Sequence, residues 1–316
     1  MDEFDLIKEY FSPLENGTHE VVVGNGDDAA IINMPAGKSI ALSVDTLVEG
    51  VHFLSDAPAR MVGYRAAAIN FSDMAAMGAT PCYALLSLTI PSNCDKWLRD
   101  FSLGLGECFR EYDCSLIGGD TTRGPLTISL TIIGAVSGRQ LTRARAQIGD
   151  CILVSGTLGD ARAALDILNK PSIGVEEKFL VNRYERPIAR TRLSVSLLGV
   201  ANSAIDVSDG LLADLGHVAT ASKVGINVYV DTLPISTSLE SIYGEDKARE
   251  FALSGGDDYE VIYAIPETFL DEAHLMANKT GTRLTQIGIV TAGSEVRCFT
   301  KGGKEIFSSS KGFSHF

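Results

Sequence analysis

Leu126-Thr127-Ile128-Ser129-Leu130-Thr131-Ile132 alternates apolar with hydroxyl-bearing side chains. This period of two is typical of a β-strand with one apolar face and one hydroxyl face, here predicted over residues 126–136. Other short apolar runs predict strands at residues 21–23, 40–44, 83–90, 151–155, 204–207, 226–230, 259–265 and 284–289. Patterns of helical period lie between them, at residues 58–77, 95–112, 158–168, 185–198 and 211–222. Strands interspersed with helices predict an α/β or α+β fold.

The chain is long enough for two domains, because it has 316 residues of which 45% are apolar. A boundary is expected in the polar segment Arg143–Gln147, since Gly149-Asp150 and a new strand follow it directly. The predicted domains are therefore residues 1–146 and 147–316.

The chain is acidic, with 27 basic against 40 acidic residues and a net charge of −13. This balance argues against a nucleic-acid partner, because clustered Lys and Arg dominate such binding. The N-terminal segment Met1–Asp5 lacks the basic start and apolar run of a signal peptide. No stretch approaches the roughly 18 apolar residues of a membrane span. We therefore expect a cytoplasmic protein without a membrane contact, whose six scattered cysteines are reduced.

Two adjacent carboxylates, Asp27 and Asp28, follow the strand Val21–Val23 through a glycine-rich turn. The spacing Gly-x-Gly-x-x-Ala superficially matches a dinucleotide-binding turn. That interpretation is disfavoured, because two carboxylates would face a pyrophosphate where such a turn presents bare amides. A solvated turn is the structural alternative, and metal coordination is the favoured interpretation.

Asp73 lies on the apolar stripe of the predicted helix at residues 58–77. A buried carboxylate carries a penalty of roughly several kcal/mol unless it is paired or coordinated. A partner such as Arg65 is the structural alternative, and a cation is the functional one. Asp45 is expected at the end of its strand, on the same face as Ser43.

Further aspartates are edged by Gly, Ser or Thr, nearly all of them at predicted strand or helix junctions; they are Asp120, Asp206, Asp209, Asp257 and Asp258. Gly118-Gly119 before Asp120 predicts a loop whose backbone approaches a phosphate closely. Any single aspartate could cap a turn, but the repetition favours a shared site. Because the chain has no Cys/His cluster, oxygen ligands favour several Mg²⁺ ions over zinc. Mg²⁺ between carboxylates and a polyphosphate would reconcile an acidic chain with a nucleoside triphosphate. Neither a Walker motif nor a protein-kinase motif is present.

Four segments in chain order resemble the nucleotide half of the aminoimidazole-ribotide-synthetase-like superfamily: Gly24–Ala30, Ser43–Phe53, Asn70–Ala79 and Gly118–Gly124. Four more extend the similarity to the family of thiamine-monophosphate kinases within it: Leu141–Arg143, Ala204–Leu212, Leu253–Glu260 and Gly312–Phe316. The resemblance implies a two-domain, synthetase-like α/β fold. Its N-terminal domain would bind ATP and Mg²⁺ and form a shared β-barrel in a homodimer, and its C-terminal domain would be α/β.

The resemblance also implies an activity, the ATP-dependent phosphorylation of thiamine monophosphate to thiamine diphosphate in thiamine diphosphate biosynthesis. By motif matching, the Mg²⁺ ligands would be Asp27, Asp28, Ser43, Asp45, Asp73, Asp120, Asp206 and Asp209. ATP would contact Gly119, Asp120, Arg143 and Ser208, and the thiamine phosphate would contact His52, Asp257 and Phe313. Two positions depart from the family pattern: Val44 stands where Thr is frequent, and Asp257 where Glu is frequent.

No general base is expected for this reaction. The second pKa of a phosphomonoester is about 6, so the acceptor is already largely an anionic nucleophile at pH 7. The main barrier is then the repulsion between two anions, which positioning and cations reduce. The hypothesis is direct in-line transfer without a phosphoenzyme.

Other interpretations stay open for single residues and for the function. His52 could be an ordinary structural histidine, Arg143 part of a solvated linker, and Phe313 a core aromatic. A purine-pathway synthetase, a Mg²⁺-dependent phosphohydrolase and an inactive nucleotide sensor are rival functions. Selenophosphate synthetase would need a Cys before the first glycine-rich turn, and none precedes Cys82.

Overall fold

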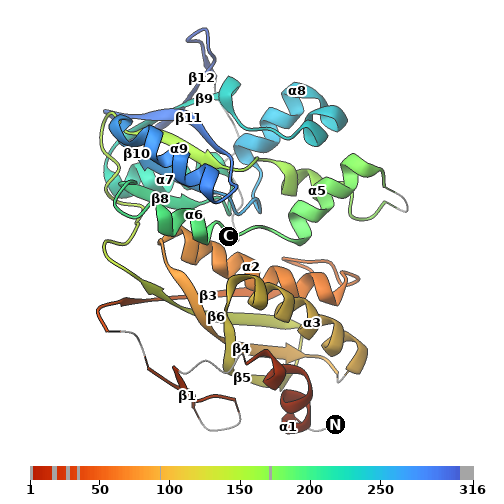
Figure 1. The fold of residues 1–316 in the computed structure, drawn as a ribbon. Helices are drawn as coiled ribbons and strands as arrows, with labels where there is room; N and C mark the ends of the chain where they lie inside the picture. The colour runs from red at the N-terminus through yellow and green to blue at the C-terminus, as the bar shows by residue number, and fades with distance from the viewer. Residues whose placement is uncertain are drawn as a thin grey trace. The chain divides into compact units, whose positions relative to one another are not determined.

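The computed structural model describes residues 3–15, 20–25, 29–33, 36–92, 94–170 and 173–306. The chain divides into two compact units (Figure 1). The first unit comprises Met1–Met74 and Ala79–Gly138, and the second comprises Ala75–Gly78 and Arg139–Phe316. The division therefore falls after Gly138, because the polar segment that follows hydrogen-bonds within the second unit, as Thr142 O does to Ala204 N–H.

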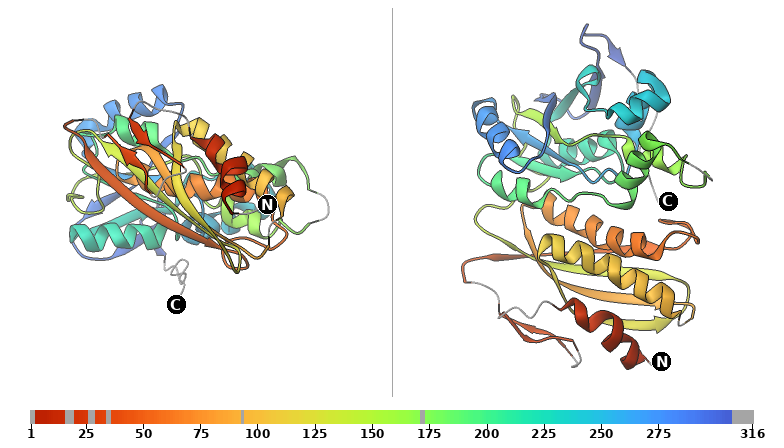
Figure 2. Two further views of the ribbon diagram at one scale, coloured as in Figure 1. Left: turned by 90° about the horizontal axis from the view of Figure 1, so that it is seen from below. Right: turned by 45° about the vertical axis from the view of Figure 1, so that its right-hand side comes forward.

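A four-stranded sheet organises the described part of the first unit, with the strand order β3-β6-β4-β5. These strands are β3 (Ser39–Val48), β6 (Thr127–Val136), β4 (Thr80–Ile90) and β5 (Ser115–Arg123). The strand β6 pairs antiparallel with both β3 and β4, and β4 pairs parallel with β5. Two helices, α2 (Ala59–Ala76) and α3 (Asp95–Tyr112), lie side by side against this sheet (Figures 1 and 2).

The N-terminal part of the chain adds short elements to the first unit. They are α1 (Glu3–Leu6), the helical turns η1 (Ile7–Phe11) and η2 (Ser12–Leu14), and the antiparallel pair β1 (Val21–Val23) and β2 (Ile31–Ile32).

The four-stranded sheet is buried on one face only. Ile128, Leu130 and Ile132 of β6 are buried, as the alternation predicts, and the residues between them are half-buried. The register continues this face onto β3, where Leu47 opposes Ile128. On the other face, β3 leaves Ile40, Leu42 and Val44 between 53% and 68% exposed. Within one chain, the sheet therefore presents an open apolar stripe, which we define as Ile40, Leu42 and Val44.

The helices α2 and α3 cross at two glycines. A Cβ atom on Gly104 would overlap the carbonyl of Arg60, and one on Gly63 would overlap that of Phe101. Only glycine allows backbones to approach this closely. The close crossing contributes to the burial of α2 over residues 61–72, because α3 covers the side of α2 that carries Gly63.

A seven-stranded mixed sheet organises the described part of the second unit, with the order β13-β12-β9-β11-β7-β10-β8. The strands are β7 (Cys151–Ser155), β8 (Ser203–Asp206), β9 (Gly225–Tyr229), β10 (Val261–Ile265), β11 (Leu284–Thr291), β12 (Val296–Phe299) and β13 (Glu305–Ile306). The helices are α4 (Asp160–Leu165), α5 (Val175–Glu185), α6 (Thr191–Ser196), α7 (Leu211–Ser222), α8 (Thr237–Ser254) and α9 (Leu270–Lys279), with the turns η3 (Val230–Thr232) and η4 (Glu267–Phe269).

Both faces of this second sheet are covered. Along β7, Ile152 and Val154 belong to a core shared with α7, and Cys151 and Leu153 belong to a second core. The second core includes Leu193 of α6 and further residues of α9. A strand that is buried on both faces needs apolar side chains at successive positions. This explains the continuous apolar run Cys151–Val154 in β7.

The two-unit α/β architecture with mixed sheets confirms the coarse prediction of the fold. The helices at 95–112 and 211–222 and the strand at 151–155 have the predicted bounds. The predicted loop around Gly118-Gly119-Asp120 is wrong, because these residues lie inside β5. Asp45 does not end its strand, since β3 continues to Val48. The helices α5, α8 and α9 were not predicted.

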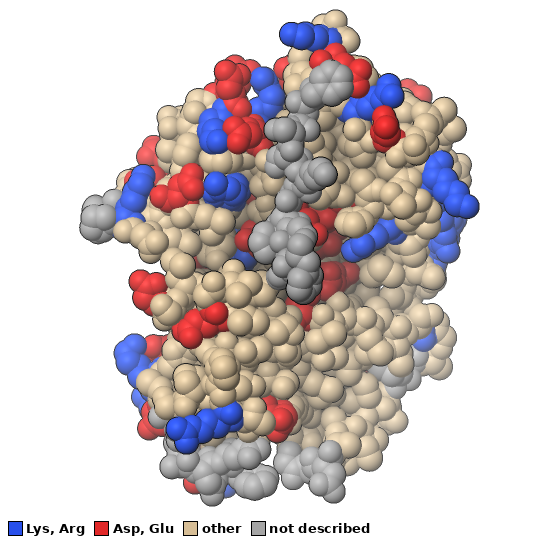
Figure 3. Space-filling model, turned by 180° about the vertical axis from the view of Figure 1, so that it is seen from behind, with Lys and Arg blue, Asp and Glu red and all other residues tan. Residues whose placement is uncertain are grey.

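Surface and hydropathy features agree with the composition. None of the helices within the described ranges is long and apolar enough to traverse a bilayer. On the face drawn in Figure 3, Lys and Arg side chains are interspersed with Asp and Glu, rather than gathered into one basic patch.

A buried ion cluster connects several elements of the second unit around Glu260. Its carboxylate accepts hydrogen bonds from Arg190 Nε and Nη2, both at 2.6 Å, from Arg183 Nη2 at 2.7 Å and from Ser155 Oγ at 2.5 Å. Burial opposes ionisation, but the charges of Arg190 and Arg183 outweigh it and hold the pKa of Glu260 below its usual value. Glu260 is therefore ionised and paired.

We predict that Glu260→Gln lowers the free energy of unfolding at pH 7 by about 3–5 kcal/mol, because it leaves buried guanidinium groups uncompensated. Since the pKa of Glu260 is lower in the folded state, its contribution is present at neutral pH and is lost as the pH falls through that value. The difference from wild type should therefore shrink below about pH 4. Urea unfolding across this range measures it.

The matched control is Glu250→Gln, which removes an exposed pair with Lys247 at 2.8 Å. Its expected effect is below about 1 kcal/mol. Equal effects of the two substitutions would contradict the role of the buried cluster.

Candidate functional site

Three predicted metal ligands meet on the helix-covered side of the first sheet. Ser43 and Asp45 project from β3, and Asp73 projects from α2. The Ser43 hydroxyl donates to Asp73 Oδ2 at 2.5 Å, although the two residues are 30 positions apart. The backbone N–H of Asp45 donates to Asn70 Oδ1 at 3.2 Å, which ties the strand to the same helix.

The charges of this group favour a bound cation. Burial, and after it the negative charge of Asp73, raises the pKa of Asp45 to about 6. A cation would remove both costs, because it compensates the desolvation and screens the two carboxylates from each other. The donors are two carboxylates and a hydroxyl, and such hard oxygen ligands fit Mg²⁺.

Asp120 lies on the opposite face of the same sheet. In the register, Asp45 opposes Leu130, whereas Asp120 is beside Ser87, which opposes Ser129. Because side chains alternate between the faces of a sheet, Asp120 points away from the helices. The structure therefore brings Ser43, Asp45 and Asp73 together and leaves Asp120 apart from them within one chain.

A cavity of about 660 Å³ opens beside Asp120. Gly118, Gly119 and Asp120 line one wall, and apolar residues such as Phe11 and Ile133 line others. Gly119 has a φ of +154°, and a Cβ at this position would overlap the carbonyl of Leu86. Glycine is therefore required here by the close pairing with β4. The sequence alone had suggested a different reason for this glycine, the close approach of a phosphate.

The turn with Gly26, Asp27 and Asp28 lies outside the described residues. Its two flanking residues, Asn25 and Ala29, line the same cavity as Asp120.

Asn25 anchors the start of this turn. Its amide Nδ2 donates to Leu116 O of β5 at 2.8 Å, and its backbone N–H donates to Glu15 Oε2 at 3.0 Å. The cavity is thus the place in the first unit where the glycine-rich turn begins and where Gly119-Asp120 is presented.

The second unit holds another group of predicted ligands, at the turn between β8 and α7. Asp206 is the last residue of β8 and is buried, and Asp209 lies in the turn. Asp214, in the first turn of α7, accepts hydrogen bonds from three successive backbone N–H groups, those of Ser208, Asp209 and Gly210, at 3.1, 3.2 and 3.1 Å. Asp214 therefore determines the shape of the turn that presents Asp209.

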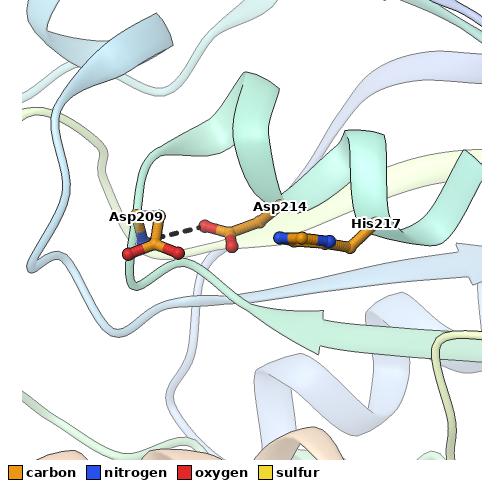
Figure 4. Close-up of side chains that lie close together, drawn as sticks. All are labelled: Asp209, Asp214 and His217. Atoms are coloured by element: carbon orange, nitrogen blue, oxygen red, sulfur yellow. Dashed lines mark hydrogen bonds between the residues drawn. The ribbon is translucent and has the colours of Figure 1, made fainter. Parts of the chain in front are cut away.

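Asp209, Asp214 and His217 form a compact group (Figure 4). One ligand atom from each residue lies within 4.8 Å of the others. Among the described residues, these three are therefore close enough to share a cation. Burial, and next the charge of Asp209, raises the pKa of Asp214 to about 7, although the amide hydrogen bonds lower it. Sequence reasoning missed Asp214 and His217; their i, i+3 spacing on one helix face was the available indication.

The segment with Asp257 packs directly on this turn. Asp257 N–H donates to Ser208 O at 2.9 Å, and Tyr259 N–H donates to Val207 O at 2.9 Å. Gly256 allows the contact, because a Cβ there would overlap the carbonyl of Ser208. The structure thus brings Asp257 next to the predicted ATP contact Ser208.

The remaining predicted contacts have different surroundings. His52 is half-buried, and its Nδ1 accepts the N–H of Val48 at 3.0 Å; in the neutral ring Nε2 then carries the proton. The side chain of Arg143 is exposed, while its carbonyl accepts hydrogen bonds from the hydroxyls of Ser203 and Ser222. Phe313 lies outside the described residues.

Comparison with known protein families defines the class of the chain. Residues 26–136 match the family described as AIR synthase related protein, N-terminal domain, and residues 147–301 match the corresponding C-terminal domain. The chain thus belongs to the AIR synthase related proteins.

Individual relatives narrow the class. A thiamine-monophosphate kinase of Escherichia coli (strain K12) is 42% identical, over 99% of this chain and 98% of the relative. A crystal structure of thiamine-monophosphate kinase from Stenotrophomonas maltophilia K279a superposes with a TM-score of 0.89 at 39% identity, covering 95% of this chain and 97% of that one. A structure of AaThiL complexed with AMPPCP and TMP has a TM-score of 0.80 at 34% identity, covering 90% and 89%. The chain belongs to the thiamine-monophosphate kinase family.

We predict that Asp73→Asn weakens stabilisation by Mg²⁺ without destabilising the metal-free protein. Asn keeps an acceptor for the Ser43 hydroxyl but removes the charge that acts on Asp45. Mg²⁺ at about 100 times its Kd should stabilise the wild type by about 2.7 kcal/mol. The thermal shift with and without Mg²⁺ measures the change, and the variant should lose at least about half of the wild-type shift.

Asp56→Asn, at an exposed aspartate, serves as the control and should keep the wild-type shift. If Asp73→Asn responds to Mg²⁺ as Asp56→Asn does, Asp73 is not a ligand.

Proposed function

We propose that the protein transfers the γ-phosphoryl group of ATP to thiamine monophosphate, giving ADP and thiamine diphosphate. The observation that carries this proposal is the 42% identity to a thiamine-monophosphate kinase over 99% of the chain. The related AaThiL complexed with AMPPCP and TMP supports an ATP-like nucleotide and TMP as the two ligands. A purine-pathway synthetase is the less favoured alternative, because the named relatives carry the kinase name.

The nucleotide is assigned to Gly119, Asp120, Arg143 and Ser208. The cavity beside Gly119 and Asp120 has apolar walls and a polar edge, and this combination fits a ligand with an aromatic base and a charged tail. Arg143 supplies an exposed cation whose backbone is held by two hydroxyls. An exposed guanidinium group can bind a phosphate without breaking a buried ion pair.

The metal ligands in the proposal are Asp27, Asp28, Ser43, Asp45, Asp73, Asp120, Asp206 and Asp209. Several Mg²⁺ ions bound to them would neutralise the charge of the triphosphate and of the acceptor phosphate. The raised pKa of Asp45 supports the assignment of Asp45 and Asp73, because it reflects burial and then the neighbouring charge of Asp73. Asp214 keeps Asp209 in position through the backbone of the turn.

The acceptor is assigned to His52, Asp257 and Phe313. His52 offers an Nε2–H donor, because Nδ1 already accepts a backbone N–H. The protein has no need of a general base, since a phosphate acceptor is largely dianionic near pH 7. Its residues instead orient the acceptor for direct in-line attack on the γ-phosphorus.

We further propose that the protein acts as a cytoplasmic homodimer in which the first units pair through their sheets into a shared barrel. The open apolar stripe on β3, with its three exposed residues, supports this pairing, because exposed apolar patches mark interaction surfaces. Asp120 lies on the same face as this stripe. Pairing through that face would place Asp120 near the partner.

The activity is tested by ADP release in a coupled assay with Mg²⁺, ATP and one of three acceptors. Thiamine monophosphate should support turnover, whereas thiamine and formylglycinamidine ribotide should not. Turnover with the ribotide alone would identify a purine-pathway synthetase, and ADP release without an acceptor would identify a phosphohydrolase. With a chirally labelled γ-phosphate, transfer should invert the configuration at phosphorus; retention would contradict direct in-line attack.

The pairing of protomers is tested by Leu42→Glu. A charge in the middle of the open apolar stripe should dissociate the dimer at micromolar concentration, which light scattering after gel filtration detects as half the wild-type mass. Leu275→Glu is the control, because Leu275 of α9 is similarly exposed, at 54% against 68% for Leu42. A wild-type protein of monomer mass would contradict the pairing, as would an unchanged mass in Leu42→Glu.

A further inference from the structure

The segment Asp257-Asp258-Tyr259 has an unusual backbone for residues that are not glycine. Asp257 has a φ of +68° and Tyr259 a φ of +50°, and the buried Asp258 lies between them. A left-handed conformation costs roughly 1–3 kcal/mol at a residue other than glycine. Such a conformation persists only where the surroundings impose it, and it is common at functional sites.

Buried hydrogen bonds impose this conformation from one side. Asp258 Oδ2 accepts the N–H of Gly159 at 2.6 Å, and Asp258 Oδ1 accepts the N–H of Ala161 at 3.2 Å. These two bonds attach the middle of the segment to the start of α4.

Backbone pairing imposes it from the other side. The N–H groups of Asp257 and Tyr259 donate to Ser208 and Val207, and the N–H of Val207 donates to Glu260 O at 2.8 Å. The segment is therefore held between α4 and the turn that carries Ser208, and its backbone has little freedom.

The side chains of Asp257 and Tyr259 meet as a result. The Tyr259 hydroxyl donates to Asp257 Oδ1 at 3.2 Å. This contact restrains the orientation of a carboxylate that is itself only half-buried. Asp has two side-chain torsions, so a hydrogen bond of this kind helps to select its direction.

We propose that Tyr259 is a positioning residue for the acceptor, and that it acts through Asp257. This inference rests on the proposed function, in which Asp257 contacts the acceptor. A carboxylate repels the acceptor phosphate, so Asp257 faces the cationic or amino-bearing end of the molecule. Tyr259 orients the carboxylate of Asp257. The backbone hydrogen bond from Asp257 to Ser208 fixes the distance between Asp257 and Ser208, the residue assigned to the nucleotide.

Tyr259→Phe tests the proposal, because it removes the hydroxyl and keeps the ring and its backbone preferences. The KM for thiamine monophosphate should rise about 10-fold, because the acceptor must then order the Asp257 carboxylate on binding. The kcat and the KM for ATP should stay within about 2-fold of wild type. A merely structural role would change all three together.

Tyr243→Phe is the matched control in the same unit. Its hydroxyl donates to the backbone of α4, at Ala163 O and 3.3 Å, so both KM values should be those of wild type.

A double-mutant cycle with Asp257→Gly then tests whether Tyr259 acts through Asp257. Glycine accepts the positive φ without strain and removes the carboxylate. In that background Tyr259→Phe should change the KM for thiamine monophosphate by less than about 2-fold, because interacting residues are not additive.

The outcomes separate the two levels of inference. Wild-type turnover of thiamine monophosphate together with an unchanged KM in Tyr259→Phe overturns the positioning role and leaves the proposed function intact. An equal effect of Tyr259→Phe in both backgrounds also overturns it. Absence of wild-type turnover with thiamine monophosphate overturns the proposed function, and the role of Tyr259 as an acceptor-positioning residue with it.

Discussion

The pairing of β6 with β3 on one side and β4 on the other is the constraint on which the first unit depends. Its register assigns every neighbouring side chain to one of two faces. One face is buried under α2 and α3, whose close crossing requires Gly63 and Gly104. That face carries Asp45 toward Asp73, and the other carries Asp120 beside the cavity. A shift by one residue would exchange the two faces and separate these groups.

In the second unit, buried carboxylates are stabilised in two different ways. Asp214 and Asp258 accept backbone N–H groups and so define the conformation of the two segments that meet at Ser208. Glu260 is compensated by two arginines. An acidic chain can bury these groups because each has donors. Stability and site geometry are in this way provided by the same residues.

Much of the fold followed from local patterns. The alternation in β6 and the apolar stripe of α3 predicted their elements, because burial acts on each with its own period. The segment Gly118-Gly119-Asp120 resembles a loop in sequence, because two glycines are typical of a turn, but pairing along its length with β4 makes it a strand. The sequence did not predict that Asp214 and Asp258 accept hydrogen bonds from backbone N–H groups, because the fold brings these groups close.

Amino-acid order alone was enough to reveal the family and to indicate a set of carboxylates, edged by small residues, as the candidate ligands. These properties are local or lie in the order of motifs, so they need no contact between distant parts. Only the folded chain decided which carboxylates are neighbours. Asp45 meets Asp73 across 28 residues and Asp258 meets α4 across nearly a hundred, because sheet register and helix packing, unlike periodicity, depend on the whole unit at once.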